Sequence, residues 1–376
     1  MLQFNPIDES RTFIGHDLGG KANKWWGGVL AGNGVIYCAP FNSDRVLKID
    51  TQSGSVTTIQ VILPEQGSWS SAALAPDGCI YFMPYYSRRI LRLDPITDTI
   101  GSVGIDFGRG LRKFSGTVVG VDGNVYGIPF WSRRIAKYDP IDGRTSFIGD
   151  ESEDRIFDCT GNGVLGRDGH IYAFMEIGQV LKIDTAIATY SFVGDIMKVS
   201  SNDKLMDAAL GNDGCIYWAP SHANRVLKYD PRANNTFYVG NDLGNRRYKW
   251  SGGAVTSTGV ICCTPWNANR VLIIDPFEDF IARLYANMER YPEKLGLLFT
   301  ENNGVNEYES ATVKFGTRKV SRAIMGILPS ANEVFPTSNL YPCLLAASHP
   351  DIALWFIYHL FRQVPSIVNC PTNHGE

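Results

Sequence analysis

Gly214-Cys-Ile-Tyr-Trp-Ala-Pro220 is one of six similar segments whose spacing along the chain decides the fold. The others are Gly34-Val-Ile-Tyr-Cys-Ala-Pro40, Gly78-Cys-Ile-Tyr-Phe-Met-Pro84, Gly123-Asn-Val-Tyr-Gly-Ile-Pro129, Gly169-His-Ile-Tyr-Ala-Phe-Met175 and Gly259-Val-Ile-Cys-Cys-Thr-Pro265. Their glycines lie 44 to 46 residues apart, and a second apolar run ending in Asp follows each one, such as Arg225-Val-Leu-Lys-Tyr-Asp230. This regular period indicates a repeat architecture.

Each repeat has the pattern of four short strands. Runs rich in Val, Ile and Tyr alternate with turn residues, and Asn212-Asp213-Gly214 is typical of a tight hairpin because Asp and Gly tolerate positive φ. The first run is made of small residues in most repeats, as in Ser251-Gly-Gly-Ala-Val255, which suits a strand crowded around an axis. The sequence therefore predicts a mainly β fold, a six-bladed β-propeller with four-stranded blades.

The two ends of the chain depart from this pattern. Phe4-Asn-Pro-Ile-Asp8 matches Tyr138-Asp-Pro-Ile-Asp142, so we expect an N-terminal outer strand that joins the last blade and closes the ring. Residues 279–376 show helical spacing over 280–299, 309–328 and 352–368, and Leu340-Tyr-Pro-Cys-Leu-Leu-Ala-Ala-Ser348 resembles part of an ankyrin-type helix pair. The prediction is a propeller over 1–278 followed by a small helical domain over 279–376.

Composition excludes several classes of protein. The 376 residues carry 35 basic and 38 acidic side chains, a net charge of −3, so the field expected for nucleic-acid or membrane-surface binding is missing. The N-terminus lacks a secretory pattern, and no apolar run is long enough to span a bilayer. The eight cysteines show no metal-ligand spacing, and those in strand-like runs are typical of small buried apolar residues. We expect a cytoplasmic protein.

One face of the predicted propeller carries the longer loops, and its aromatic residues are the first candidates for ligand binding. The candidates are Trp25, Trp26, Trp69, Phe114 and Trp250 at the start of inner strands, with Tyr86, Trp131, His222 and Trp266 in the loops between second and third strands. The alternative is that the repeated aromatics pack between blades. On that alternative, the non-repeated Tyr86, Trp131 and His222 are the better ligand candidates.

A second recurring feature is an arginine before the third strand of every repeat except the fourth. These residues are Arg45, Arg89, Arg134, Arg225 and Arg270. They suggest either a broken ring of guanidinium groups for an anionic ligand or local bonds from each arginine to a loop carbonyl or carboxylate.

Residues for catalysis are sparse. The six histidines do not cluster in sequence, and no nucleophile elbow, phosphate loop or His-Glu-x-x-His motif is present. Asp158 and Asp207 are the acidic residues nearest the inner strands, where they either share the axial channel and hold a cation or are solvated at its mouth. We assign no catalytic residue, metal ligand or cofactor.

The repeat Asp-Gly-x-Ile-Tyr followed by Arg-Val-Leu-x-Ile-Asp-Pro resembles streptogramin lyases and gluconolactonase/regucalcin-type propellers over residues 1–275. That resemblance implies the fold and, for an enzyme, a divalent metal held by inner-strand Glu, Asn, Asp or His, none of which is matched in this sequence. The whole chain, including Tyr358-His-Leu-Phe-Arg362, also resembles a family of propeller-repeat proteins predicted from microalgal genomes, which implies no activity.

The sequence favours a non-catalytic propeller that binds a protein, peptide or small-molecule ligand on its aromatic loop face. The alternative is a metal-dependent hydrolase or lyase of the gluconolactonase or streptogramin-lyase type acting at the axial channel. A third possibility is that the C-terminal domain binds the partner and the propeller presents it.

Overall fold

The computed structural model describes residues 1–6, 8–63, 67–110, 112–150, 157–197 and 204–277, together with residues 311 and 320. Met1–Ile274 form one compact unit that contains every named strand. Apart from residues 311 and 320, the helices expected over 280–299, 309–328 and 352–368 lie outside the described residues, so the domain boundary after residue 278 stays a prediction. In the described part of the chain, no helix is long and apolar enough to cross a membrane.

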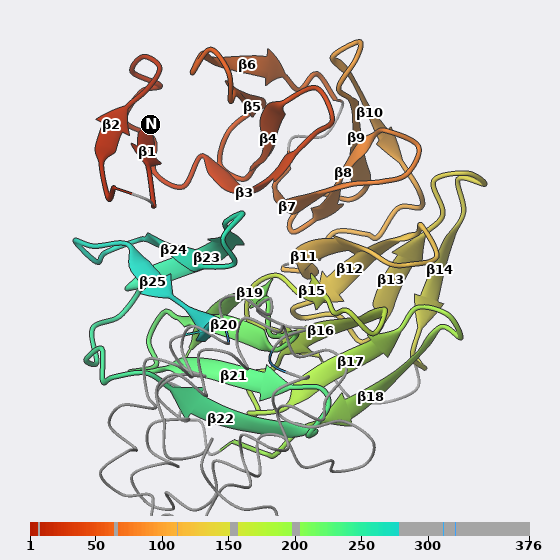
Figure 1. Ribbon diagram of the computed structural model, residues 1–376. Coiled ribbons are helices and arrows are strands. Elements are labelled where there is room, and N and C mark those ends of the chain that lie inside the picture. The colour runs from red at the N-terminus through yellow and green to blue at the C-terminus, as the bar shows by residue number, and fades with distance from the viewer. Residues whose placement is uncertain are drawn as a thin grey trace, which may run out of the picture. The chain divides into compact units, whose positions relative to one another are not determined.

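Six antiparallel sheets form the blades of a propeller, as predicted (Figure 1). The first three blades are β3 (Trp25–Leu30) to β6 (Val56–Gln60) with β4 (Val35–Pro40) and β5 (Arg45–Asp50); β7 (Trp69–Leu74), β8 (Ile80–Pro84), β9 (Ile90–Asp94) and β10 (Thr99–Val103); and β11 (Phe114–Val119), β12 (Val125–Pro129), β13 (Ile135–Tyr138) and β14 (Thr145–Ile148). The last three are β15 (Val164–Leu165), β16 (His170–Phe174), β17 (Val180–Asp184) and β18 (Thr189–Val193); β19 (Leu205–Leu210), β20 (Ile216–Pro220), β21 (Val226–Asp230) and β22 (Asn235–Val239); and β23 (Trp250–Val255), β24 (Ile261–Pro265) and β25 (Leu272–Ile274).

The N-terminal segment forms strands, but the pairing differs from the prediction. β1 (Leu2–Phe4) pairs with β2 (Arg11–Phe13), and the last blade has three strands among the described residues. The reason is packing after β2, because Ile14 and Leu18 lie against Leu47, Ile49 and Val56 of the first blade. The expected strand exchange with the last blade is therefore replaced by a local hairpin beside the first one.

A polar contact explains the recurring Asp-Gly-x-Ile-Tyr motif. The tyrosine hydroxyl donates to the Asp of the preceding hairpin in four successive blades, at 2.5 to 2.8 Å, and in the first blade the Tyr37 hydroxyl accepts from the Asn33 amide at 3.0 Å. The four donor–acceptor pairs are Tyr81–Asp77, Tyr126–Asp122, Tyr172–Asp168 and Tyr217–Asp213. A third-strand lysine joins the pair in two blades, through Lys137 and Lys228.

The last repeat lacks all three members of this contact. Thr258 replaces the aspartate, Cys262 the tyrosine and Ile273 the third-strand lysine or arginine. Removing only one member would leave a buried polar group without its partner, so their joint replacement is what the energetics of buried hydrogen bonds favour. The turn residue and the tyrosine of the motif therefore act as one structural unit.

Five of the six inner strands are irregular where they approach the axis. Register shifts place one extra residue in each of these strands, at the equivalent residues Gly27, Ser71, Asp207 and Gly252 and, one position earlier in the third blade, at Ser115. Gly27, Ser71 and Gly252 have φ values of 66°, 55° and 70°. β-Bulges redirect side chains near functional sites. Here they bring Asp207, alone among the five with a charge, to the centre of the ring.

Candidate functional site

A continuous series of aromatic rings crosses the loop face over the first three blades. It runs from Trp26 through Phe41 and Tyr85 to Phe130 and Trp131, with neighbouring ring centroids 4.9 to 6.0 Å apart. We call these five residues the aromatic arc. Trp131 is 52% exposed, so the outer end of the arc offers apolar surface to a ligand.

A second aromatic group lies over the last two blades. The Tyr248 ring stands edge-to-face on His222 at 4.5 Å and lies 5.1 Å from Trp266. His222 is buried and its Nε2 has no hydrogen-bond partner among the described residues. Burial and the nearby Lys204, Arg247 and Lys249 lower the pKa of His222, so its ring is neutral at physiological pH.

A central cavity of about 550 Å³ lies between these two aromatic groups. Its walls include Trp26 and Phe41 from the arc and Trp266 from the opposite side. Inner strands β3 and β23 flank it, and its polar lining consists largely of Ser71, Asn162 and Asp207 near the axis, together with Ser251 and Thr264. An aromatic cavity with a few convergent polar groups is the usual form of a ligand site.

The polar end of the cavity is held by hydrogen bonds between blades. The Asn162 backbone N–H donates to Asp207 Oδ1 at 2.5 Å, and the Asn162 side-chain amide donates to Ser71 Oγ at 2.9 Å. Glycines make this approach possible: a Cβ on Gly161 would lie 2.4 Å from the Asp207 nitrogen, and one on Gly252 would lie 2.8 Å from Asp207 Oδ2. The position of the Asp207 carboxylate is therefore fixed by its neighbours.

Asp207 carries a charge that its surroundings do not balance. Asp207 is half-buried, it lines the cavity, and burial raises its pKa. In the part of the chain that the structure describes, no Lys or Arg forms an ion pair with it. Its titratable neighbour is Cys263, a buried thiol whose pKa is raised to about 12 and which is therefore neutral.

The axial residues do not fit a divalent metal. Within the described residues, no group of three or more His, Cys, Asp or Glu side chains is placed to hold a metal ion. Asp207 Oδ1 already accepts from Asn162, and the Asn162 amide oxygen is buried against Gly116. One open carboxylate oxygen is a poor match for Ca²⁺, which draws several of its oxygen ligands from carboxylates and carbonyls, so no catalytic step is derived through a metal.

Asp158 has different surroundings from Asp207, contrary to the shared channel that we considered. It lies in the fourth blade between the bridges Ser132–Phe157 and Cys159–Met175, beside Glu176, and Lys204 forms an ion pair with Glu176 at 2.6 Å. Burial and the Glu176 carboxylate raise the pKa of Asp158 to about 6, while Lys204 and Trp131 act in the opposite direction. Glu176 of the fourth blade thus stands where the first three blades place Phe41, Tyr85 and Phe130.

Glu176→Gln is expected to lower the pKa of Asp158 below about 6, because it removes the neighbouring negative charge and releases Lys204. The folded-state value exceeds the ordinary one, so folded protein binds the proton more tightly, and this group's contribution to stability falls as pH rises from about 4 to about 6. Carboxyl-carbon NMR titration of Asp158 measures the shift. An unchanged midpoint in the variant would contradict the assignment.

The repeated tryptophans have structural hydrogen bonds. The indole N–H groups of Trp25, Trp69 and Trp250 donate to the backbone carbonyls of Arg45, Arg89 and Arg270 at 2.7 to 2.9 Å, each twenty residues further along the chain. Phe114 fills the equivalent position as a fully buried ring. Trp25 also lines the central cavity, so among these four residues it stays closest to its predicted binding role.

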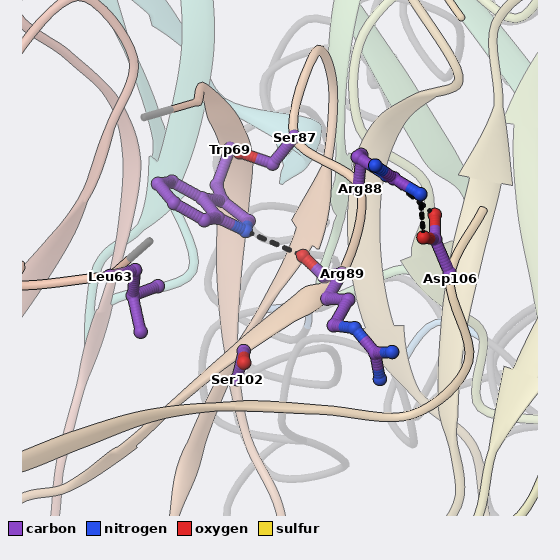
Figure 2. A pocket seen from close by; sticks show the side chains of 7 residues that line it. All are labelled: Leu63, Trp69, Ser87, Arg88, Arg89, Ser102 and Asp106. Atoms are coloured by element: carbon purple, nitrogen blue, oxygen red, sulfur yellow. Dashed lines mark hydrogen bonds and ion pairs between the residues drawn. The ribbon is translucent and has the colours of Figure 1, made fainter. Parts of the chain in front are cut away.

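A smaller cavity of about 360 Å³ beside the second blade shows how such residues are used (Figure 2). The Trp69 indole points to the Arg89 carbonyl, and Arg88 forms an ion pair with Asp106. The Arg89 guanidinium donates to the carbonyl of Gly104 at 2.7 Å. The charges that line this cavity thus have partners inside the blade, in contrast to Asp207.

The recurring arginines do not line the central cavity. Arg45 donates to Thr58 Oγ1 at 3.4 Å, and the Arg134 guanidinium lies 4.0 Å from the centroid of Phe147. Arg225 and Arg270 are exposed. Arg89 bonds to a loop carbonyl and Arg45 Nε lies 4.0 Å from Asp44 Oδ1, which agrees with the local bonds weighed as the alternative, whereas Arg134 contacts an aromatic ring. A role of the arginines in anion binding stays a prediction.

Sequence reasoning missed several residues of the site. Asn162, Ser71, Glu176, Lys204 and Tyr248 were not singled out, although the first two stand where other repeats place glycine or serine. Aligning the repeats position by position would have drawn attention to Asn162 next to Asp207. Their meeting at the axis depends on bulges, which periodicity does not reveal.

Comparison with solved structures places this propeller among streptogramin B lyase-like folds. A streptogramin B lyase matches with a TM-score of 0.56 and 14% identity, over 68% of this chain and 80% of that chain. Virginiamycin B lyase from Staphylococcus aureus gives 0.55 and 12%, over 68% and 83%, and hydrazine synthase from Kuenenia stuttgartiensis gives 0.53 and 15%, over 69% and 79%. No protein-family model matches the sequence, and no curated protein does so significantly. At this identity the likeness concerns the fold alone.

Proposed function

We propose that this protein is a ligand-binding propeller whose binding site is the central cavity together with the aromatic arc. The observation that carries this proposal is the convergence of Trp26, Phe41 and Trp266 on one cavity that ends at Asp207. The aromatic rings supply apolar contact area, and the polar end supplies orientation. The ligand is a protein segment, peptide or small molecule small enough to place one group in a space of about 550 Å³.

The double variant Tyr86→Ala/Trp131→Ala is expected to weaken binding by roughly tenfold or more, because exposed aromatic anchors contribute a large share of binding energy. Both side chains are well exposed, at 38% and 52%, so the melting temperature is expected to change little. A thermal-shift screen of peptides, sugars and amines supplies the ligand, and calorimetry then compares the variant with the native protein.

Ile141→Ala provides a control, because this side chain is 90% exposed in the turn after β13. It removes exposed apolar surface away from the arc and is expected to leave affinity unchanged. Equal affinities for the native protein and the double variant would contradict the involvement of Trp131, at the outer end of the arc, and of the adjoining Tyr86.

The enzymatic alternative makes a different prediction. Solved neighbours include lyases by name, but their likeness is to the fold. A metal-dependent hydrolase or lyase would be stabilised by Mg²⁺ or Ca²⁺ through Asp207, whereas the binding proposal expects no change in melting temperature with either ion. The same thermal-shift instrument therefore separates the two functions.

A further inference from the structure

We propose that the central cavity binds a small organic cation, with an ammonium group placed between the Asp207 carboxylate and the rings of Trp26 and Trp266. This inference rests on the proposed function and names the chemical class of its ligand. It follows from an unbalanced charge, from the aromatic walls around it and from the exceptional place of Asp207 in the repeat.

The charge is the first reason. A carboxylate taken out of water is stable only when a counter-charge or several hydrogen bonds compensate for the lost hydration. Asp207 Oδ1 has one donor, the Asn162 N–H, and Oδ2 lies beside Gly252 where it opens to the cavity. No ion pair within the described residues involves Asp207, so the counter-charge has to come from a proton or from a ligand.

The nearby lysines do not supply that charge. Lys24 donates to the carbonyl of Leu18 at 2.8 Å, Lys113 to Gly110 at 2.9 Å and Lys249 to Ala223 at 2.8 Å. Each stands just before an inner strand and secures a loop. These cations therefore stabilise the loop face and leave the centre of the ring negative.

The aromatic walls are the second reason. Cations bind favourably over the faces of Trp, Tyr and Phe, with Trp the strongest, and the attraction grows when water is excluded. Trp26, Phe41 and Trp266 line the same cavity as Asp207. A neutral sugar or an anion would use the rings but would leave the carboxylate uncompensated, whereas an organic cation uses both.

The third reason is that the fold does not require a carboxylate at this point. Gly27, Ser71, Gly116, Asn162 and Gly252 occupy the equivalent position of the other blades without one. The blade geometry therefore permits a small neutral residue at position 207. Asp207 thus adds a half-buried carboxylate, unpaired with any cation among the described residues, at a position where other blades have a neutral residue, as expected of a binding residue.

The protonation state of Asp207 gives the proposal a definite pH dependence. Burial raises the pKa of Asp207, and its titratable neighbour Cys263 remains a neutral thiol. A bound cation takes the place of the proton on Asp207, so affinity for the cation is expected to fall as pH is lowered through the pKa of Asp207. Above this pKa the carboxylate is already ionised, and binding releases no proton. Without ligand, the protein is expected to lose stability as pH rises through the pKa of Asp207.

The experiment uses the full chain and two isosteric probes. Choline is compared with the neutral alcohol in which a tert-butyl group replaces its trimethylammonium group, and n-butylammonium serves as a primary-amine probe. Melting temperature and calorimetry at neutral pH are the readouts. We expect at least one of the two cations to bind and to raise the melting temperature, and the neutral alcohol to bind roughly tenfold more weakly or not at all.

Asp207→Asn tests the carboxylate. The variant keeps an oxygen for the Asn162 N–H, removes the charge, and is expected to lower cation affinity by about thirtyfold or more. Without ligand, its melting temperature at neutral pH is expected to equal or exceed that of the native protein. Asp142→Asn makes the same charge change in an exposed turn and is expected to alter neither quantity.

Trp266→Leu tests the aromatic wall. Trp266 is 40% exposed, so the replacement is expected to fold, and cation affinity should fall roughly fivefold while the weak binding of the neutral alcohol changes less. This difference separates an interaction with the cation from a general loss of apolar contact.

Three results would overturn the inference. The first is that neither cation binds while Mg²⁺ or Ca²⁺ stabilises the native protein and not Asp207→Asn, which would make the carboxylate a metal ligand. The second is a strong loss of stability in Asp207→Asn, which would make the carboxylate structural. The third is a ligand whose affinity depends on Tyr86 and Trp131 but not on Asp207; in that case the proposed function stands and the cation assignment fails.

Discussion

Asp213→Ala is expected to lower the free energy of unfolding by about 3–5 kcal/mol, since removing one partner of a buried ion pair leaves the other charge uncompensated. Asp213 and Lys228 are 4% and 1% exposed, and their charged atoms lie 2.9 Å apart. The Tyr217 hydroxyl and the Cys215 N–H also donate to this carboxylate. Burial acts to raise the pKa of Asp213, but Lys228 and these donors hold it below its ordinary value, so the stabilisation is lost on acidification.

Urea denaturation at neutral pH measures this loss. The control is Asp98→Ala, which removes the exposed partner of Lys48 between two blades and is expected to cost about 0.2–1 kcal/mol. Combining Asp213→Ala with Lys228→Met should recover part of the stability, because no charge is then left buried. Equal losses of stability for Asp213→Ala and Asp98→Ala would show that burial does not determine how much the Asp213–Lys228 ion pair contributes.

Much of the fold could be predicted because each blade of a propeller has a similar sequence pattern. Three features recur with a period of about 45 residues: a glycine in the hairpin, a tyrosine on the second strand and an aspartate at the end of the third strand. This period is typical of a propeller. The pairing of the first strand could not be predicted in the same way. A match between Phe4–Asp8 and an outer strand identifies the kind of strand, whereas its partner was decided by the packing of Ile14 and Leu18 on the first blade.

The candidate site was only partly predictable for a related reason. Aromatic residues in loops are visible in the sequence, and Trp26, Trp131 and Trp266 do lie on the face expected for them. Whether an indole faces a ligand or a backbone carbonyl depends on its hydrogen bond, and this separates Trp69 from Trp26. Asp207 and Asn162 meet because the bulge in β19 and the close approach at Gly161 bring two blades together at the axis, and a sequence period does not reveal such contacts.

Gly161→Ala is expected to lower the free energy of unfolding by about 2–5 kcal/mol and to abolish cation binding. The glycine has a φ of 81°, which costs an L-residue about 1–2 kcal/mol, and the new Cβ would lie 2.4 Å from the Asp207 nitrogen, an overlap that adds about 1–3 kcal/mol. Because the obstructing atom is backbone, the strand that carries Asp207 has to move, and the carboxylate moves with it.

Gly78→Ala is the matched control. Its φ is also 81°, but a Cβ there meets nothing within 4 Å, so only the backbone strain of about 1–2 kcal/mol is expected and cation binding should be unchanged. Thermal denaturation and choline calorimetry on both variants separate strain from displacement. If Gly161→Ala lost no more stability than Gly78→Ala and still bound the cation, the close approach of the fourth and fifth blades would not be what positions Asp207. A loss of binding in Gly161→Ala alone would tie the ligand site to the same glycine that lets the two inner strands meet.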